Sequence, residues 1–205
     1  MNGVEADGTT LEIEVKVRAP SVDEALRRLA HLPALARDTR RFEDNDIYDT
    51  PDRALSGRHH LLRLRVVEGR GTVTFKQRVE SDLRAKVRAE AQTGVTSPEA
   101  TREILRSLGY VRIYRYQKYR RYYAWTDPAT GAALAITLDE TPIGVFMELE
   151  GPKEGIDRAA GRMGYAESDY IVDDYRALHL EWLKDRSLPE TDMVFSGPDP
   201  GGPSR

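Results

Sequence analysis

The feature that most constrains the fold is a one-by-one alternation of apolar and charged residues. Residues 11–18 read LEIEVKVR, with Leu, Ile and Val at the odd positions and Glu, Lys and Arg at the even ones. Successive side chains of a β-strand point to opposite faces, so this pattern predicts a strand with one apolar and one fully charged face. Taken alone, it is also typical of an ordinary strand whose outer face meets water.

The same alternation recurs along the chain and predicts an antiparallel β structure. Further strands are expected at residues 62–66, 72–78, 86–92, 112–125, 133–139 and 145–150. Many short strands at regular spacing are typical of a sandwich or a barrel. Residues 43–58 carry turn signals, so we expect a loop there with, at most, a short strand at residues 46–48.

Helices are expected between some of these strands. Ser21 and Glu24 have the spacing of a capping box, and Ser97 precedes a proline in the position that begins a helix. The expected helices run from Ser21 to about Leu32, between Ser97 and Gly109, over residues 155–163 and over residues 170–184.

The charged faces contain almost only Glu, Asp, Lys and Arg, whereas a solvated face would include Thr, Ser and Gln. The helices also need an apolar surface on which to pack. The simplest arrangement is therefore inverted. Apolar strand faces point outward beneath helices, and charged faces line the interior of a closed antiparallel β tunnel.

Strand parity defines the side chains that are expected to point inward. The acids are Glu12, Glu14, Glu90, Asp139, Glu148 and Glu150, and the bases are Lys16, Arg18, Arg63, Arg65, Lys76, Arg88, Lys118 and Arg120. Burying so many charges in a dry interior is too costly, so we expect the tunnel to hold water or charged ligands. The excess of bases, together with carboxylate oxygens, suits a polyanion bound with Mg²⁺ or Mn²⁺.

Several of these motifs resemble one known family. The segment from Glu12 to Lys16 resembles the ExExK signature of the CYTH family, also called triphosphate tunnel metalloenzymes. Later segments resemble the family's motifs in the same order, and residues 139–151 are similar to bacterial members labelled class IV adenylate cyclases. The resemblance covers roughly residues 10–180. It departs from the family at Gln92, where an acid is common, and at Asp174-Tyr175, where Ser-Tyr is common.

The resemblance implies an α+β fold, in which a tunnel of eight antiparallel strands binds one or two divalent metals and has helices packed outside. It implies that the eight inward bases bind a triphosphate, with Lys16, Arg65 and Lys76 catalytic, and that the six inward acids bind metal. The family includes inorganic, thiamine and RNA 5′-triphosphatases and adenylate cyclases. The fold therefore does not fix the reaction.

Three functions stay open at this point: a metal-dependent triphosphate hydrolase, an adenylate cyclase that converts ATP to cyclic AMP and pyrophosphate, and a non-catalytic polyphosphate or nucleotide binder. Carboxylates repel phosphate unless a metal lies between them, which disfavours the binder. No segment indicates an adenosine pocket, so we place hydrolysis slightly ahead of cyclisation.

Composition narrows the partners and the setting. The formal net charge is only −3, which disfavours nucleic acid and leaves a small triphosphate as the expected partner, with a homodimer left open. The chain has no cysteine, no apolar leader and no apolar stretch of membrane-spanning length, so we expect a cytoplasmic protein. One domain is expected over residues 11–184, between flexible ends at 1–10 and 185–205. His59-His60 is expected to lie in a solvated turn.

Overall fold

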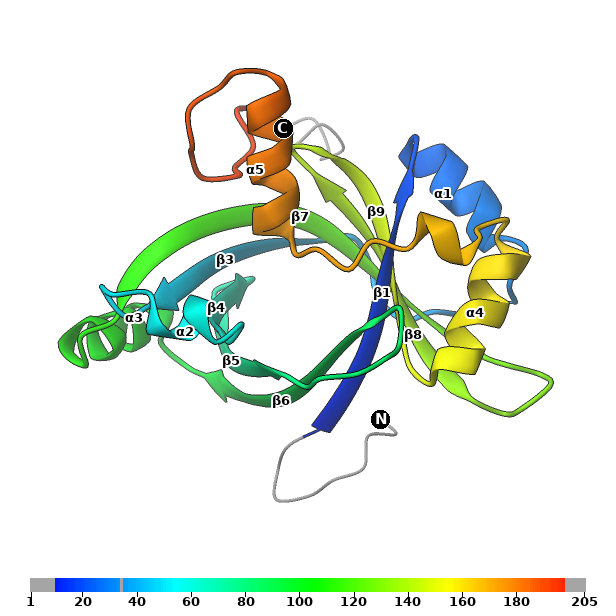
Figure 1. Ribbon diagram of the computed structural model, residues 1–205, viewed down its shortest axis with the longest axis horizontal. Helices are drawn as coiled ribbons and strands as arrows, with labels where there is room; N and C mark the ends of the chain where they lie inside the picture. Colours follow the sequence, from blue (N-terminus) through cyan, green and yellow to red (C-terminus); the bar gives the residue numbers. More distant parts are fainter. Residues whose placement is uncertain (1–9, 34, 198–205) are drawn as a thin grey trace.

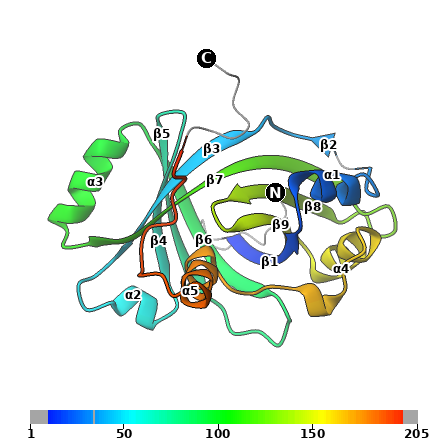
Figure 2. The ribbon, with the colours of Figure 1, turned by 90° about the horizontal axis from the view of Figure 1, so that it is seen from above.

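A closed antiparallel barrel forms the centre of the molecule in the computed structural model, which describes residues 10–33 and 35–197 (Figures 1 and 2). The strands follow the order β7-β3-β4-β5-β6-β1-β9-β8, and pairing of β8 with β7 closes the ring. The strands are β1 (Thr10–Ala19), β3 (Arg41–Asp49), β4 (Leu61–Val67), β5 (Arg70–Arg78), β6 (Lys86–Val95), β7 (Val111–Thr126), β8 (Ala133–Thr141) and β9 (Gly144–Glu150). A short strand, β2 (Leu35–Ala36), pairs with β7 beside the ring. The predicted eight-stranded tunnel is confirmed.

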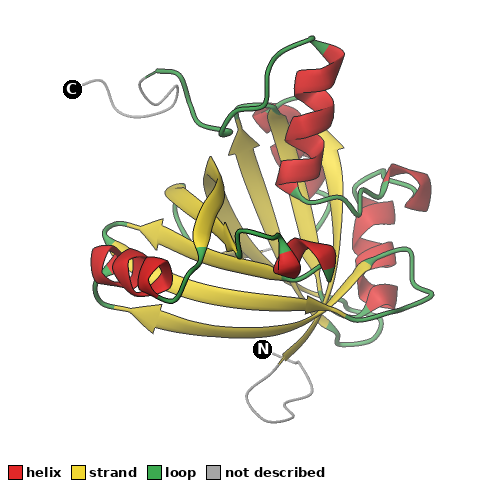
Figure 3. Cartoon of the chain, turned by 60° about the vertical axis from the view of Figure 1, so that its left-hand side comes forward, coloured by secondary structure: helices red, strands yellow, loops and turns green. Residues whose placement is uncertain are grey.

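Helices surround this barrel, as Figure 3 shows, and two of them also contribute residues to its cavity. They are α1 (Val22–Leu29), α2 (Ala54–Gly57), α3 (Pro98–Ser107), α4 (Lys153–Arg162) and α5 (Tyr175–Asp185), with a 3₁₀ turn at Glu167–Asp169. The predicted helix starts at Ser21 and Ser97 are correct, because each hydroxyl accepts a hydrogen bond from the backbone N–H three residues on.

The hydrophobic core lies between the barrel and its helices, which confirms the inverted arrangement. Val15 and Val17 of β1 are buried with Leu149 of β9 and with Ile156 of α4. A second cluster packs α5 on β7 and a third packs α3 on β4 and β5. The first and third clusters thus place apolar strand faces beneath α1, α3 and α4. The second cluster differs, because Tyr114 and Tyr116 face inward and meet α5 at the cavity.

Strand β3 differs from the loop predicted for this part of the chain. Its sequence, RFEDNDIYD, is rich in residues that favour turns, yet it pairs with β4 on one side and β7 on the other. Two full hydrogen-bonded ladders outweigh the weak strand preference of Asp and Asn. The strand also places Glu43 and Asn45, both almost fully buried, in the barrel wall.

The last helix begins later than predicted. Asp174 caps it by accepting from the backbone N–H of Ala177 at 2.9 Å, so α5 starts at Tyr175. The linker before it, residues 170–174, is extended, and Ile171 exchanges two backbone hydrogen bonds with Lys16 of β1.

Residues after α5 return to the barrel. Met193 is buried and its backbone bonds to Arg115 and Gln117 of β7, so the flexible tail predicted from residue 185 makes defined contacts over part of its length. Residues 198–205, and nearly all of the predicted flexible start, lie outside the described residues. Across the described ranges, no helix combines the length and the apolar character that crossing a bilayer requires.

Candidate functional site in the barrel interior

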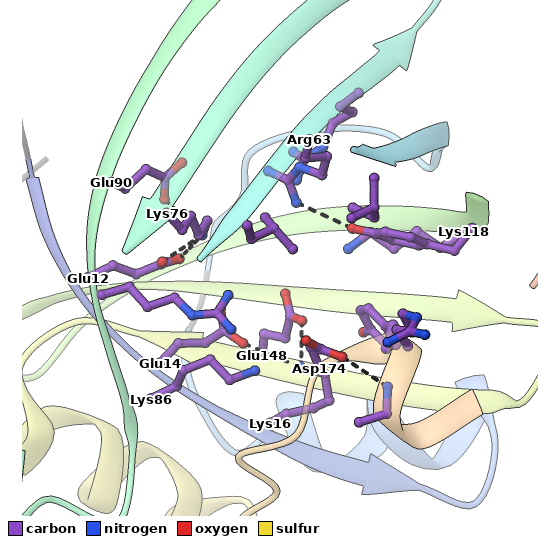
Figure 4. Close-up of a pocket in the computed structure, with 18 of the residues that line it drawn as sticks. Glu12, Glu14, Lys16, Arg63, Lys76, Lys86, Glu90, Lys118, Glu148 and Asp174 are labelled. Carbon is purple, nitrogen blue, oxygen red and sulfur yellow. Dashed lines mark hydrogen bonds and ion pairs between the residues drawn. The ribbon is translucent and has the colours of Figure 1, made fainter. Parts of the chain in front are cut away.

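A cavity of about 660 Å³ occupies the inside of the barrel. Arg18 and Asp139 are the predicted inward residues that do not line this cavity. The predicted residues that do line it are Glu12, Glu14, Lys16, Arg63, Arg65, Lys76, Arg88, Glu90, Lys118, Arg120, Glu148 and Glu150. Figure 4 shows side chains from several strands directed into this one space. Cross-strand register interleaves the two signs, because Lys16 lies opposite Glu148 and Lys76 lies opposite Glu90.

One cluster of charges joins β1, β5 and β6. The Lys76 ammonium lies 2.6 Å and 2.7 Å from the two carboxylate oxygens of Glu12 and 2.8 Å from Glu90. All three side chains point toward one another in the close-up (Figure 4). A base between two acids is held by charge-assisted hydrogen bonds, which fix its position at the cavity wall.

A second cluster joins β1, β7, β8 and β9. Lys16 lies 2.9 Å from Glu148, which also accepts from Arg120. Despite burial, Arg120 and Lys16 hold the pKa of Glu148 well below its usual range. Arg120 and Lys118 in turn bond to Asp139, at 2.5 Å and 2.9 Å.

Asp139 takes a different place from the one predicted. It is fully buried, and its oxygens accept hydrogen bonds from Lys118, Arg120 and the Tyr175 hydroxyl. The carboxylate of Asp139 thus already accepts hydrogen bonds from three side chains, and it does not line the cavity. In this position Asp139 fixes the two bases in front of it. Metal binding by Asp139 stays a prediction.

Arg18 is the second predicted residue that the structure places elsewhere. Its side chain is exposed, donates to the Ile143 carbonyl at 3.2 Å and lies over the Phe146 ring. β1 extends beyond the cavity at this end, so correct parity does not bring Arg18 to the triphosphate site predicted for it.

Lys86 and Arg88 are basic side chains of the cavity that lack an acidic partner. In the described part of the chain, neither Lys86 nor Arg88 forms an ion pair or a hydrogen bond through its side chain. Burial, with Lys16 nearby, lowers the pKa of Lys86 to about 8. A bound anion would relieve both the desolvation and the repulsion.

Sequence reasoning missed several residues of this cavity. Lys86 is two residues before Arg88 on the same strand, so strand parity could have predicted that it points inward. His59 lies in an exposed turn, as expected, and both His59 and His60 also line the cavity. Gln92 and Asp174 also line the cavity, as do Tyr114, Tyr116, Tyr122 and Tyr175. Glu43 was hidden by the loop prediction; its carboxylate lies 3.4 Å from Arg65 and 3.6 Å from Lys118.

The carboxylates fit a divalent cation in charge and donor type. Glu150 accepts no hydrogen bond and forms no ion pair within the described residues. The low-dielectric surroundings and the nearby Glu12, Glu14 and Glu90 carboxylates raise the pKa of Glu150 to about 7. Within residues 10–33 and 35–197, no three acidic or histidine side chains converge closely enough to hold a metal on their own. A metal here would therefore need further oxygens, which phosphate groups supply.

Replacing Glu150 by Gln should stabilise the metal-free protein at pH 8 and leave it unchanged near pH 4. A carboxyl group whose pKa is higher in the folded state than in the unfolded state lowers the stability of the folded protein as pH rises from about 4.5 to about 7. Above pH 7 this destabilisation is complete. Glu150 is exposed to solvent at the cavity, which screens these interactions, so we expect a gain of only a few degrees. Melting temperatures in chelator at both pH values test this. An equal or lower melting temperature of the variant at pH 8 would contradict it.

A closed antiparallel β tunnel whose interior interleaves carboxylates with Lys and Arg is the structural feature that the family comparison has to match. The chain belongs to the CYTH domain family, which matches residues 10–162.

Comparison with known proteins agrees with this assignment. A Methanocaldococcus jannaschii protein, provisionally named an adenylate cyclase, is 25% identical over 141 residues, covering 68% of this chain and 76% of that protein. A Vibrio parahaemolyticus structure with a similar provisional name has a TM-score of 0.68 at 21% identity, covering 83% of this chain and 98% of that one. A structure from Hippeastrum, described as having a dominant triphosphatase activity, has a TM-score of 0.50 at 14% identity, covering 87% and 88%. At these identities the two structures show the shared fold alone.

Proposed function

We propose that the protein cleaves a triphosphate substrate inside the tunnel with the help of a divalent metal. The observation that supports this is the interleaving of Lys and Arg with five glutamates around one cavity. Bases alone would suffice to bind a polyphosphate. The glutamates only repel phosphate unless a cation lies between the two, so they favour a catalytic site over a simple binder.

The basic side chains would bind the phosphates. Arg63, Arg65 and Arg120 offer planar forks that match phosphate oxygens, and the lysines offer point charges. Lys16 and Lys76 now pair with glutamates, so a bound triphosphate and its cation would together replace those pairings. Lys86 and Arg88 form no ion pair that phosphate binding would have to break. They are therefore favourable first contacts for the incoming anion.

Mg²⁺ or Mn²⁺ would be held by Glu12, Glu14, Glu90, Glu148 and Glu150, whose oxygens suit these ions. Such a cation would neutralise phosphate charge and polarise the attacking group. The chain itself contributes positioning and electrostatic stabilisation, which are the main requirements of phosphoryl transfer.

Hydrolysis is the reaction that we place first. A water oxygen would form a bond to the terminal phosphorus while the bridging P–O bond breaks, and the electron pair would leave with the remaining phosphates. The description of the Hippeastrum protein supports this order. Cyclisation of ATP is the second candidate, supported by the names of the M. jannaschii and Vibrio proteins. It requires that a ribose 3′-hydroxyl be aimed in line at the α-phosphorus.

Product analysis tests the proposal. The purified protein is incubated with inorganic triphosphate or ATP and Mg²⁺ or Mn²⁺, with chelator as the control. We expect orthophosphate with pyrophosphate from the first substrate and orthophosphate with ADP from the second, both abolished by chelator. Cyclic AMP and pyrophosphate from ATP would reverse our order. Tight binding of triphosphate without turnover would establish the binder instead.

Replacing Arg88 by Ala should weaken triphosphate binding about tenfold with little change in melting temperature. A charge-assisted contact with phosphate is worth about 1.5 kcal/mol or more, and no carboxylate loses its partner. Calorimetric titration with inorganic triphosphate measures the effect. Arg84→Ala is the matched control, because Arg84 is exposed and lies outside the cavity lining. Equal affinities of the two variants would exclude Arg88 from the binding site.

A further inference from the structure

Tyr175 brings helix α5 into contact with the charged cavity. It is the first residue of α5, its side chain is buried, and it lines the cavity. It lies beyond residue 162, where the match to the CYTH domain ends. Its hydroxyl donates to Asp139 at 2.5 Å. Asp139 also accepts from Lys118 and Arg120, so one carboxylate connects the phenol to two bases of the cavity.

The ring of Tyr175 makes a second, separate contact with the bases. The Lys16 ammonium lies 4.6 Å from the ring centroid and the Lys118 ammonium lies 5.0 Å from it. The face of an aromatic ring carries partial negative charge, which attracts cations. Two ammonium groups of the same sign therefore share one ring, and the ring offsets part of their mutual repulsion.

The surrounding structure holds this ring in a fixed orientation. The Phe146 ring meets it edge-on at 5.6 Å between centroids, and Tyr116 lies at 5.8 Å. Asp174 caps the helix just before it. The linker is bonded to the backbone of Lys16 itself through Ile171. The same β1 residue is thus positioned through both its backbone and its ammonium group.

We propose that Tyr175 is a positioning residue that places Lys16 and Lys118 for the triphosphate, the ring through cation–π contact and the hydroxyl through Asp139. This inference rests on the function proposed above. Its consequence is that α5 is part of the binding site as well as part of the core, so a barrel that lacks this helix would present these two lysines at the wrong positions.

Two variants separate the contributions of the ring and the hydroxyl. In Tyr175→Phe the ring remains, so we expect the dissociation constant for inorganic triphosphate to rise no more than about threefold. In Tyr175→Leu the ring is lost, and we expect a rise of about tenfold or more, from two weakened cation contacts. Calorimetric titration of inorganic triphosphate with Mg²⁺ at low temperature, where turnover is slow, measures both. If the leucine variant binds as tightly as the phenylalanine variant, the ring has no positioning role.

Leu178→Ala is the matched control for helix stability. Leu178 is buried on α5 and is not part of the cavity lining. Its truncation weakens packing of α5, and we expect it to lower the melting temperature with less than a threefold effect on affinity. An affinity loss equal to that of Tyr175→Leu would mean that Tyr175 acts only by stabilising the helix, and would overturn the proposal.

A measurement on the lysines separates this inference from the proposed function. Nitrogen-15 NMR of the Lys16 and Lys118 ammonium groups needs no ligand. We expect their resonances to shift and to broaden through faster exchange with water in Tyr175→Leu, and to remain sharp in Tyr175→Phe. If the wild type binds no triphosphate, the proposed function fails, and these resonances still decide whether Tyr175 positions the two lysines. Unchanged resonances in the leucine variant would reject the inference.

Discussion

Replacing Asp139 by Ala should lower the melting temperature by about 10 °C, because a removed partner leaves buried bases uncompensated at a cost of roughly 3 kcal/mol. Asp139 is fully buried and accepts hydrogen bonds from Lys118 at 2.9 Å, Arg120 at 2.5 Å and Tyr175 at 2.5 Å. Arg120 keeps Glu148 as a partner, and Lys118 keeps only the more distant Glu43. The loss therefore falls mainly on Lys118 and on the Tyr175 hydroxyl.

Thermal unfolding in metal-free buffer at neutral pH measures the effect of Asp139→Ala. Asp173→Ala serves as the control, since Asp173 is an exposed acid two residues before Tyr175, where α5 begins. We expect the control to melt within a degree or two of the wild type. A melting temperature of Asp139→Ala that matches the control would show that the two bases find other partners or water.

Replacing Glu12 by Gln should lower metal-dependent triphosphate cleavage by at least tenfold. The amide keeps the size of the side chain and removes the negative charge that would hold the cation. Lys76 would keep Glu90 at 2.8 Å, so the cluster does not lose its last acid. We expect the metal concentration for half-maximal activity to rise, and excess Mg²⁺ to recover part of the rate.

Initial rates over a range of Mg²⁺ concentrations test the role of Glu12. Glu140→Gln is a matched control because Glu140 pairs with Arg40 and Arg121 and does not line the cavity. It should retain nearly full activity. Two results would contradict the proposed metal site. One is wild-type cleavage that persists in excess chelator, and the other is an unchanged metal requirement in Glu12→Gln.

The fold could be predicted from sequence to the extent that strand parity determines it. Alternation in β1, β4, β5, β6 and β9 gave the correct inward face, because side-chain direction in a strand depends on local geometry alone. Strand β3 could not be found in this way, since its paired position between β4 and β7 is a tertiary property. Glu43 was missed for the same reason.

The candidate site shows the same limit. Parity tells which face a side chain takes, but not how deep along the tunnel it lies. Arg18 is on the predicted face of β1 but lies beyond the end of the cavity. Asp139 is on the predicted face of β8, and its ion pairs with Lys118 and Arg120 separate it from the cavity. Tyr175 lies on a helix, where strand alternation carries no information, and only the packing of α5 brings it to Lys16.

The pairing of the first strand with the last also bears on how the chain acquires its site. β1, the first strand, pairs with β9, the last, and this pairing sets Glu14 opposite Glu150. Contacts between residues so far apart in sequence form late, because the entropy of closing a long loop must be overcome first. The glutamates of β1 therefore cannot meet those of β9 on a nascent chain until β9 has been synthesised. Affinity for a polyanion with its cation should consequently appear only in the last phase of folding, after most of the secondary structure has formed.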